Sequence, residues 1–475
     1  MIVPKSHLVK GMAFQFGVTN GDSFTQSCKG FLCSFAYFAA LREIHLKFMN
    51  IPDLYLLFQQ YPSVETDTRK LKKNDIFFAL KGPHFNGNSF AKQALESGAA
   101  YVIIDEQNAY IDERTIVVND VLTTLQELSG FHRRQLNIPV IAITGSNGKT
   151  TTKELVQAVL SSTFKSYTTQ GNLNNHIGIP LTLLRIGTDA EFAVVEMGAN
   201  HPGEIAGYCL YTQPTHGLIT NCGKAHLEGF GSIEGVRKAK GELFDYLKLH
   251  GKSAFVNADD EVLMKMSEGI PAVITYGTQQ ADVTGRILRA SPFLKLELDQ
   301  RMDNLLLETR LVGGYNLPNV LAAVAVGKTF AVAPEKIRLG IASYNPSNSR
   351  SQLIEKGTNT IILDAYNANP SSMKLAIENF SNMQENEKVL VLGSMAELGE
   401  SSVSEHEDIV ELIKKYTWKE VILVGNEFEK IPHPFVQLPD STEAASYLRK
   451  KEYQQTCLLL KGSRSMQMEK VAEVL

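Results

Sequence analysis

The stretch PVIAITGSNGKTTTK, residues 139–153, is the part of the sequence that decides the fold. It begins with an apolar, β-branched run at 140–143, which predicts a buried strand. The run breaks at Gly145 and Gly148, and a helical pattern follows with Leu155 among its apolar positions. A strand, a glycine loop, a lysine, a hydroxyl and a helix together predict a phosphate-binding site, because N–H groups at a helix N-terminus point toward the anion.

The residues of the loop have properties that suit an anion. Lys149 adds a positive charge, and a threonine hydroxyl beside it can ligate magnesium. The position five residues before Gly148 is Ile143 instead of glycine, which argues against the commonest motor and switch NTPases. An ordinary strand-to-helix turn is the alternative, although Gly-Lys-Thr-Thr after a strand is a demanding match. We expect the loop to bind a phosphate group through Gly145, Ser146, Asn147, Gly148, Lys149, Thr150 and Thr151.

The composition limits the class of protein. A chain of 475 residues is long enough for about three domains of ~150 residues. Its 44% hydrophobic and 21% charged residues are typical of a globular protein, and the net charge of −4 gives no reason to expect a nucleic-acid partner. Five scattered cysteines indicate reduced thiols and a cytoplasmic location. We expect no membrane span, because no run approaches ~18 apolar residues, and we expect a monomer.

The first 48 residues differ from the rest of the chain. They carry five basic residues against two acidic ones, and two of the five cysteines. Their apolar segment, 31–41, lies too far into the chain for an ordinary signal peptide and is too short to span a membrane. We expect residues 1–48 to be an N-terminal extension or the result of a misassigned start, with the folded protein beginning near Met49. A weak targeting segment is the alternative.

Strand and helix patterns divide the remaining chain into three α/β domains. We expect a small domain over 49–136, a central domain over 137–345 and a last domain over 346–475, where strand–helix alternation predicts a doubly wound parallel sheet. Residues 281–311 alternate and turn like antiparallel strands, so we expect them to decorate the central domain. The segment at 346–350 predicts a hinge into the last domain.

Two side chains follow strands at the edge where Lys149 is expected. Glu196 ends the strand predicted at 191–195, and His226 comes shortly after the strand predicted at 215–220. An acid at the carboxyl end of a strand beside a phosphate loop is placed to ligate magnesium. A surface carboxylate is the alternative for Glu196. A lone histidine is weak evidence, but one aligned with Lys149 and Glu196 is a fair ligand candidate.

Several polar loops are candidate substrate sites. The stretch at 168–180 places asparagines among glycines, a surface that suits a peptide or a sugar, although asparagine is also a common turn residue. The loops at 66–69 and 81–88 carry hydroxyls, arginine and lysine near glycines and are suited to a diphosphate; ordinary turns are the alternative. We expect substrate contacts from Thr68, Arg69, Lys81, Asn86, Thr169, Asn172, Asn174 and Asn175.

Eight motifs together resemble those of the Mur ligases, the ATP-dependent amide-forming enzymes of peptidoglycan synthesis. They are TGSNGKTTTKE (144–154), TQGNLNNHIGIPLTLL (169–184), VVEMGANHPGEI (194–205), AHLEGFGS (225–232), GGYNLPN (313–319), DAYNANPSSM (364–373), GSMAELG (393–399) and LLKGSR (459–464). The resemblance runs from Met49 to the C-terminus and leaves the first 48 residues out. YNANP at 366–370 and the asparagine-rich loop favour the member that adds D-alanyl-D-alanine.

The resemblance implies roles for individual residues. Lys240 matches the lysine that relatives carbamylate, a change that turns a cation into a carboxylate-like magnesium ligand. Lys238 is the alternative if the register differs, and a solvated helix face is the simpler interpretation of both lysines. The implied magnesium ligands are Thr150, Glu196, His226 and Lys240, and the implied catalytic residues are Lys149, Lys240, His226 and Glu196. The resemblance assigns the phosphate loop, 145–151, to ATP. Further implied contacts are Asn316, Asn319, Arg350 and Asp364 for ATP, and Tyr366, Asn367, Asn369 and Lys461 for the substrate.

The reaction implied by the resemblance uses ATP and Mg²⁺ to join two small molecules. The terminal carboxylate of UDP-N-acetylmuramoyl-tripeptide takes the γ-phosphate of ATP, and the amine of D-alanyl-D-alanine then displaces phosphate to give the pentapeptide. The first domain would hold the UDP end, and the last domain would bring in the dipeptide. The alternatives are another Mur-type ligase adding a different amino acid, a folylpolyglutamate synthase-like ligase, a P-loop switch or motor, and a catalytically dead binding module.

Overall fold

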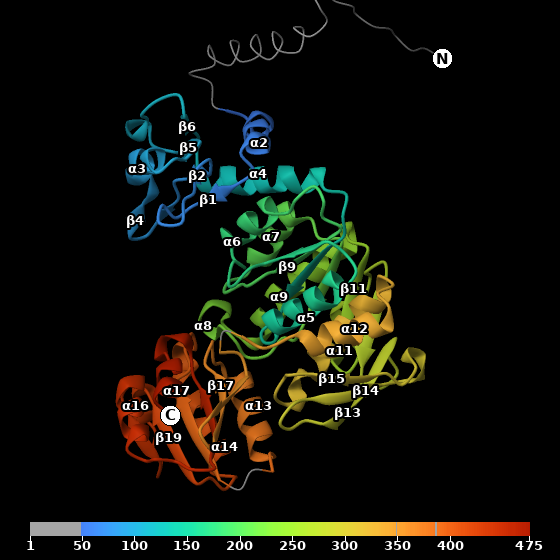
Figure 1. The fold of residues 1–475 in the computed structure, drawn as a ribbon, viewed down its shortest axis with the longest axis vertical. Coiled ribbons are helices and arrows are strands. Elements are labelled where there is room, and N and C mark those ends of the chain that lie inside the picture. Colours follow the sequence, from blue (N-terminus) through green and yellow to red (C-terminus); the bar gives the residue numbers. More distant parts are fainter. Residues whose placement is uncertain (1–48, 348, 385–386) are drawn as a thin grey trace, which may run out of the picture. The chain divides into compact units, whose positions relative to one another are not determined.

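The computed structural model describes residues 49–347, 349–384 and 387–475, so the N-terminal extension expected at 1–48 lies outside the described residues. The described chain forms three β-sheets of four, nine and six strands and one two-stranded hairpin. Helices pack against the sheets, as the ribbon shows (Figure 1). The α/β class predicted from the sequence is therefore confirmed.

The first sheet is parallel throughout, with strand order β1-β2-β5-β6. Its two longer helices begin at side-chain caps. Asn50 Oδ1 accepts a hydrogen bond from the N–H of Asp53, and Asp120 Oδ1 accepts one from Thr123, which satisfies donors that a helix N-terminus leaves free. The elements are α2 (Ile51–Gln60), β1 (Val64–Glu65), β2 (Ile76–Phe78), β3 (Lys81–Gly82), β4 (Phe85–Asn86), α3 (Ala91–Glu96), β5 (Tyr101–Ile104), β6 (Thr115–Val117) and α4 (Val121–Gln135).

The second sheet has the strand order β15-β14-β13-β12-β11-β10-β7-β9-β8, parallel from β13 to β8 and antiparallel from β13 to β15. Its strands are β7 (Val140–Thr144), β8 (Ser166–Thr168), β9 (Phe192–Glu196), β10 (His216–Ile219), β11 (Ser253–Asn257), β12 (Val273–Gly277), β13 (Val283–Arg289), β14 (Lys295–Leu298) and β15 (Leu306–Glu308). Its helices are α5 (Lys149–Ser161), α6 (Gly178–Leu184), α7 (Glu204–Thr212), α8 (Leu227–Phe230), α9 (Ile233–His250), α10 (Glu261–Met266), α11 (Leu317–Thr329) and α12 (Pro334–Ser343).

The third sheet has the order β16-β17-β21-β18-β19-β20 and is parallel except at β16. Its strands are β16 (Gln352–Lys356), β17 (Asn359–Asp364), β18 (Lys388–Gly393), β19 (Glu420–Val424), β20 (Val436–Leu438) and β21 (Cys457–Lys461). Its helices are α13 (Pro370–Ser381), α14 (Ser402–Ile413), α15 (Asn426–Glu429), α16 (Ser441–Arg449) and α17 (Glu469–Val474).

Strand β7 lies between two apolar layers, because successive side chains of a strand point to opposite faces. Ile141 and Ile143 belong to one core with residues of α5, α11 and α12. Val140 and Ala142 belong to another core with residues of α6, α7 and α9. Burial on both faces explains the continuous apolar run in the sequence, and it fixes the position of the loop that follows the strand.

The structure tests two predictions about the sheets. Residues 281–311 form antiparallel strands, as predicted, and these strands extend the second sheet, since Tyr276 of β12 pairs with Val283 of β13. The third sheet, predicted to be parallel, is not wholly so, because β16 pairs antiparallel with β17 at its edge. Periodicity within one segment does not reveal the strand it pairs with, which explains this error.

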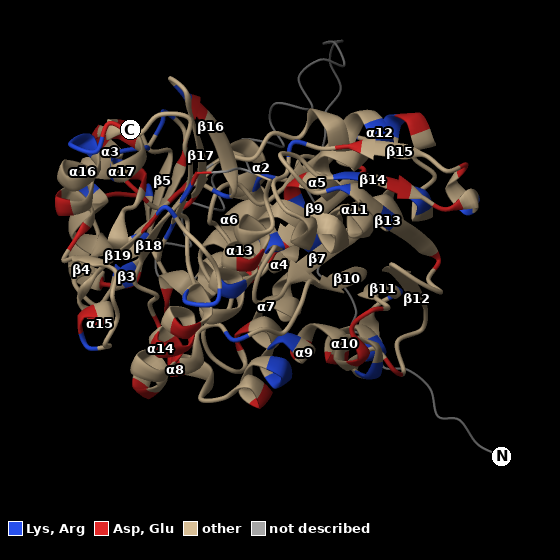
Figure 2. Ribbon diagram, turned by 90° about the horizontal axis from the view of Figure 1, so that it is seen from below, with Lys and Arg blue, Asp and Glu red and all other residues tan. Residues whose placement is uncertain are grey.

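The part of the chain that the structure describes has no helix long and apolar enough to cross a membrane. Acidic and basic side chains are mixed along the surface helices, as α9 and α12 show (Figure 2). Several of these charges form pairs three residues apart, such as Glu234 with Arg237 and Glu335 with Arg338. Exposed pairs of this kind add little to stability.

A buried arginine connects α4 to the second sheet. Burial lowers the pKa of Arg133, and the side chain is 6% exposed. Its guanidinium donates hydrogen bonds to the carbonyl oxygens of Leu136 (2.7 Å), Thr212 (3.0 Å) and Gln213 (3.1 Å). The charge is thus solvated by backbone carbonyl groups from the connection after α4 and from the end of α7.

Replacing Arg133 with methionine should destabilise the protein by roughly 3 kcal/mol, because buried carbonyl oxygens lose their donors. The free energy of unfolding in urea measures this loss. Arg134→Met is the matched control, since Arg134 is the exposed neighbour on the same helix. Equal stability of the two variants would contradict the role given to Arg133.

Candidate active site

The loop between β7 and α5 has no room for side chains at its two glycines. Gly145 has a φ of 137°, and a Cβ there would lie 2.0 Å from Thr220 Oγ1. Gly148 has a φ of 79°, and its Cβ would lie 2.7 Å from Asn319 Oδ1. Both the backbone conformation and the space therefore require glycine.

Residues after β10 hold the loop in place. Thr220 Oγ1 donates a hydrogen bond to the carbonyl oxygen of Asn147 (2.6 Å). Asn221 Oδ1 accepts one from the N–H of Asn147 (3.1 Å). Ser146 Oγ donates to the carbonyl oxygen of Gly223 (2.7 Å). The loop conformation is thus determined by the neighbouring parallel strand.

Lys149 begins α5 and folds back over the loop. Its Nζ donates to the carbonyl oxygens of Gly145 (2.7 Å) and Ser146 (3.1 Å). Burial is the main influence on this amine and lowers its pKa, while the charge of Glu196 acts in the opposite direction. The two hydrogen-bond acceptors are neutral, so the amine is available to an anion that enters the loop.

Glu196 is the buried acid of the site. It ends β9, is 1% exposed, and accepts hydrogen bonds from Thr150 Oγ1 (2.9 Å) and Asn174 Nδ2 (2.8 Å). Both donors are neutral, and no described lysine, arginine or histidine forms an ion pair with this carboxylate. Burying a carboxylate without a cation is costly, so the position suits a divalent cation.

The structure separates the two candidate lysines of α9. Lys240 is 1% exposed, and Lys238 is exposed. Lys240 Nζ donates to the carbonyl oxygen of Ala199 (3.0 Å) and lies 4.9 Å from the ring centroid of Phe230. Burial, followed by repulsion from Lys149, lowers the pKa of Lys240 to about 7. The interpretation as a solvated helix face is therefore confirmed for Lys238 and wrong for Lys240.

His226 contacts an acid that sequence analysis did not identify. Its Nδ1 lies 2.5 Å from Glu397 Oε2, and this histidine is the main cause of the lowered pKa of Glu397. The two residues have φ values of 52° and 61°, a region that costs a non-glycine residue about 1 kcal/mol or more. The GSMAELG motif that contains Glu397 was a signal for this acid, but nothing in the sequence showed that it reaches His226.

The predicted metal ligands fit magnesium unequally. No three His, Cys, Asp or Glu side chains come together as a metal site anywhere in the described ranges. The Thr150 hydroxyl and the Glu196 carboxylate do lie together, and magnesium prefers oxygen ligands. The Lys240 amine is not such a ligand, and it would become one only as a carbamate.

Asn316 and Asn319 support the start of α5. Thr152 Oγ1 donates to Asn319 Oδ1 (3.1 Å), and Asn319 Nδ2 donates to Asn316 Oδ1 (3.0 Å). Asn316 Nδ2 donates in turn to the carbonyl oxygen of Val312 (2.9 Å). These asparagines, predicted as ATP contacts, form a chain of hydrogen bonds beside Gly148.

Asp364 and Lys461, predicted for ATP and for substrate, pair with each other. They are opposite residues of the parallel neighbours β17 and β21, and Lys461 Nζ lies 2.5 Å from Asp364 Oδ2. Nearby, the Arg350 guanidinium carbon lies 3.5 Å from the ring centroid of Tyr366. Arg350 Nε is buried without a hydrogen-bond partner.

Asn369 caps α13 and reaches the phosphate loop. Its Oδ1 accepts a hydrogen bond from the N–H of Ser372 (2.9 Å), and its Nδ2 donates to Asn147 Oδ1 (2.8 Å). Asn367 is exposed, and its carbonyl oxygen lies 3.5 Å from Lys461 Nζ. YNANP thus places one side chain against the loop and leaves another in solvent.

The asparagine-rich loop divides its residues between support and solvent. Thr169 is buried, and its Oγ1 accepts a hydrogen bond from the N–H of Glu196 (3.0 Å). Asn175 Oδ1 accepts from the N–H of Gly178 (2.9 Å) at the start of α6, so its observed contacts are those of a turn residue. Asn172 is exposed. Asn174, which contacts Glu196, is the member of this loop that reaches the buried acid.

The polar loops of the first sheet pair with acids of their own. Lys81 Nζ lies 2.9 Å from Asp105 and 3.0 Å from Glu106, two acids that sequence analysis missed, and Asn86 Nδ2 donates to Glu106 Oε1 (3.0 Å). Both acids directly follow β5. An acid at the end of a strand is also the pattern that identified Glu196 in the sequence.

Arg69 donates two hydrogen bonds of 2.8 Å to the Asp67 carboxylate. These bonds are the main reason that the pKa of Asp67 is lowered to about 2. The Arg69 side chain is 87% exposed, so this ion pair adds little stability. Thr68, between them, is partly buried. The structure therefore brings Lys81 and Asn86 together at one pair of acids, while Arg69 contacts the single acid Asp67.

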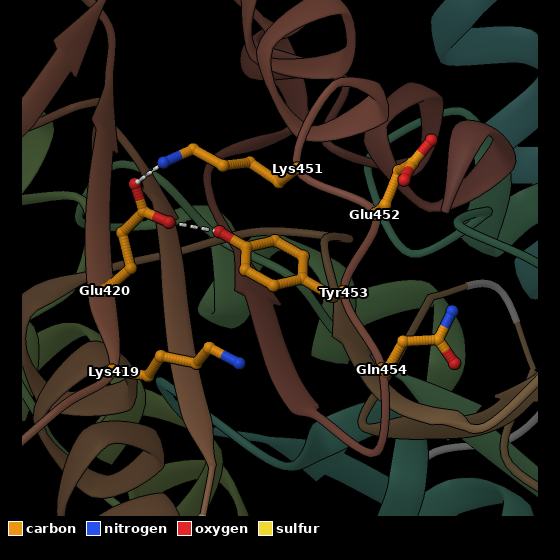
Figure 3. A pocket seen from close by; sticks show the side chains of 6 residues that line it. All are labelled: Lys419, Glu420, Lys451, Glu452, Tyr453 and Gln454. Atoms are coloured by element: carbon orange, nitrogen blue, oxygen red, sulfur yellow. Dashed lines mark hydrogen bonds and ion pairs between the residues drawn. The ribbon is translucent and has the colours of Figure 1, made fainter.

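A cavity of about 540 Å³ in the C-terminal part contains no predicted site residue. It is lined by Lys419, Glu420, Lys451, Glu452, Tyr453 and Gln454 (Figure 3). Glu420 lies 2.9 Å from Lys451 Nζ and also accepts a hydrogen bond from the Tyr453 hydroxyl. Because these groups satisfy one another, the cavity offers less to a charged ligand than the loop does.

Three descriptions of one family match consecutive parts of the chain. They are "Mur ligase family, catalytic domain" over 60–142, "Mur ligase middle domain" over 143–327 and "Mur ligase, glutamate ligase domain" over 349–464. This chain is 35% identical to each of two relatives, the UDP-N-acetylmuramoyl-tripeptide–D-alanyl-D-alanine ligases of Bacillus subtilis (strain 168) and Escherichia coli (strain K12). The matches cover 86% and 87% of this chain, and 92% and 93% of those proteins.

Two solved structures have the same three-domain fold. MurF from Acinetobacter baumannii has a TM-score of 0.79 and 30% identity, and the match covers 88% of this chain and 97% of that one. The MurF ligase from Thermotoga maritima in complex with ADP has a TM-score of 0.76 and 28% identity, with 87% and 96% covered.

Gly148→Ala should cost more stability than Gly203→Ala. Both glycines precede a helix with a left-handed φ, of 79° and 87°, but a Cβ at 203 meets nothing within 4 Å. Gly203→Ala should therefore cost only the backbone strain, about 1 to 2 kcal/mol, while Gly148→Ala should cost roughly 1 to 3 kcal/mol more by displacing Asn319. Urea unfolding of both variants measures the difference, and equal losses would show that the loop is not tightly packed.

Proposed function

The chain belongs to the Mur ligase family, and on that premise we propose that it joins D-alanyl-D-alanine to UDP-N-acetylmuramoyl-tripeptide with hydrolysis of ATP to ADP and phosphate. The observation that carries the proposal is the buried Glu196 carboxylate beside Thr150 and Lys149 at the phosphate loop. Residues 49–136 hold the UDP end of the substrate, residues 137–345 bind ATP and residues 346–475 bring in the dipeptide. The reaction takes place in the cytoplasm.

The chemistry requires activation of a carboxylate. An oxygen of the tripeptide carboxylate forms a bond to the γ-phosphorus of ATP, and the bond to the ADP oxygen breaks. The amine of the dipeptide then bonds to the acyl carbon, loses a proton, and phosphate leaves. The first step brings a carboxylate toward a triphosphate, so cations fixed in place beforehand lower its barrier.

Lys149 supplies one of these cations from the protein itself. Its Nζ is held by two carbonyl oxygens of the loop, which orient the amine without neutralising it. The N–H groups at the start of α5 add partial positive charge at the same place. Asn369, which binds Asn147 of the loop, ties the dipeptide side of the site to the phosphate side.

Magnesium fits at Thr150 and Glu196, which offer a hydroxyl and a buried carboxylate without a cationic partner. A bound magnesium ion supplies charge neutralisation for the phosphate oxygens. His226 and a carbamate on Lys240 complete the proposed ligand set. Lys240 suits carbamylation because its pKa of about 7 leaves a neutral, nucleophilic amine for CO₂.

The substrate test is phosphate release with ATP and UDP-N-acetylmuramoyl-tripeptide, with and without D-alanyl-D-alanine. We expect sustained release, and a pentapeptide product by mass spectrometry, only when the dipeptide is present. Single amino acids in place of the dipeptide serve as controls for a sibling ligase. Turnover with a single amino acid, or with a folate and glutamate, would overturn the assignment.

Lys240→Ala should lower kcat by roughly 10- to 100-fold or more, because the site would lose a proposed magnesium ligand. Lys238→Ala is the matched control, since it removes an exposed lysine two residues away. Phosphate release with the dipeptide measures both variants, and added bicarbonate should not restore Lys240→Ala. Full activity of Lys240→Ala would show that the carbamate is not on this lysine.

A further inference from the structure

Arg464 carries a charge that nothing in the described protein neutralises. It opens the 3₁₀ turn Arg464–Met466 after β21 and is exposed. Within the described ranges its guanidinium makes no hydrogen bond or ion pair. The guanidinium lies against Tyr366, whose ring centroid is 5.3 Å from the guanidinium carbon. An arginine held against an aromatic ring keeps its planar set of donors free for an anion.

The neighbouring cations are already engaged. Lys461 is 1% exposed and pairs with Asp364 at 2.5 Å. Arg350 stacks on Tyr366 and is close enough to Lys149 to lower the pKa of that amine, which places Arg350 on the phosphate side. Of these three cations, Arg464 is therefore the one that neither pairs with a carboxylate nor lies near the phosphate loop.

The backbone holds Arg464 in a fixed position. A Cβ on Gly462 would lie 3.0 Å from the Cα of Gly393, so β21 and β18 are in close contact at their carboxyl ends. The N–H of Ser463 donates to the carbonyl oxygen of Ser394 (3.1 Å). Tyr366 and Arg464 each follow one strand of the β17–β21 pair, at the edge where parallel sheets bind ligands.

The proposed reaction needs a cation at this edge. Its second substrate, a dipeptide, has an amine that must reach the acyl carbon and a carboxylate at its other end. That carboxylate would be repelled by the phosphates unless a cation outside the phosphate site binds it. Arginine is suited to this task, because its donors match the two oxygens of a carboxylate.

We propose that Arg464, positioned by the Tyr366 ring, binds the C-terminal carboxylate of the incoming dipeptide. The proposal rests on the proposed function, because it assigns a residue to that substrate. It makes Arg464 a specificity residue, which favours acceptors with a free carboxylate over neutral ones. Arg350, against the same ring, serves the nucleotide.

Steady-state kinetics of Arg464→Gln test the proposal. The KM for D-alanyl-D-alanine should rise roughly 10- to 100-fold, while the KM values for ATP and the UDP-linked tripeptide stay unchanged. The C-terminal amide of the dipeptide is the second probe. The wild type should prefer the acid to the amide, and Arg464→Gln should lose most of this preference. Arg464→Lys should recover part of it, because lysine keeps the charge but not the paired donors.

Arg449→Gln is the matched control, because Arg449 is an exposed arginine at the end of α16 in the same part of the chain. It should leave all three KM values unchanged. A rise in the KM for ATP in Arg464→Gln, or an unchanged preference for the acid over the amide, would overturn the proposal. Failure of the proposed function is a separate result, since the wild type itself would then release no phosphate with the dipeptide.

Discussion

The close packing between the phosphate loop and the end of β10 is the constraint on which the site depends. β7 and β10 are parallel neighbours, with Thr144 opposite Ile219, so the residues that directly follow the two strands are in contact. Thr220 fills the space beside Gly145 and binds the backbone of Asn147. The loop is therefore shaped by the protein before any ligand binds, and its N–H groups and Lys149 need little rearrangement to bind an anion.

The charges around this loop are arranged at a cost in stability. Lys149 and Lys240 are held by carbonyl oxygens, and Glu196 by a hydroxyl and an amide, so that neither lysine pairs directly with Glu196. A direct Lys–Glu pair would be more stable but would leave nothing for a ligand to neutralise. The lowered pKa values of both lysines record this cost. Unpaired buried charges of this kind are more typical of a functional site than of a structural one.

Sequence patterns predicted the parts of this arrangement that depend on local order. The apolar run of β7, the glycines and Lys149 follow one another along the chain, and each has a recognisable pattern. The contacts that join distant segments were not predicted. The pairing of Asp364 with Lys461 depends on the register of β17 and β21, and the contact of His226 with Glu397 depends on how two segments pack. The burial of Lys240 was equally invisible, because a lysine on a mostly polar helix is usually solvated.

The cations near Tyr366 differ in the groups that hold them. Lysine and arginine are not equivalent here: a buried Lys461 holds Asp364 and so fixes β17 against β21, whereas the arginines lie on an aromatic ring and keep their donors free. Arg350 and Arg464 lie against the same ring. Movement of Tyr366 would therefore affect both arginines together. With the roles proposed for them, this would couple dipeptide binding to the position of the phosphates.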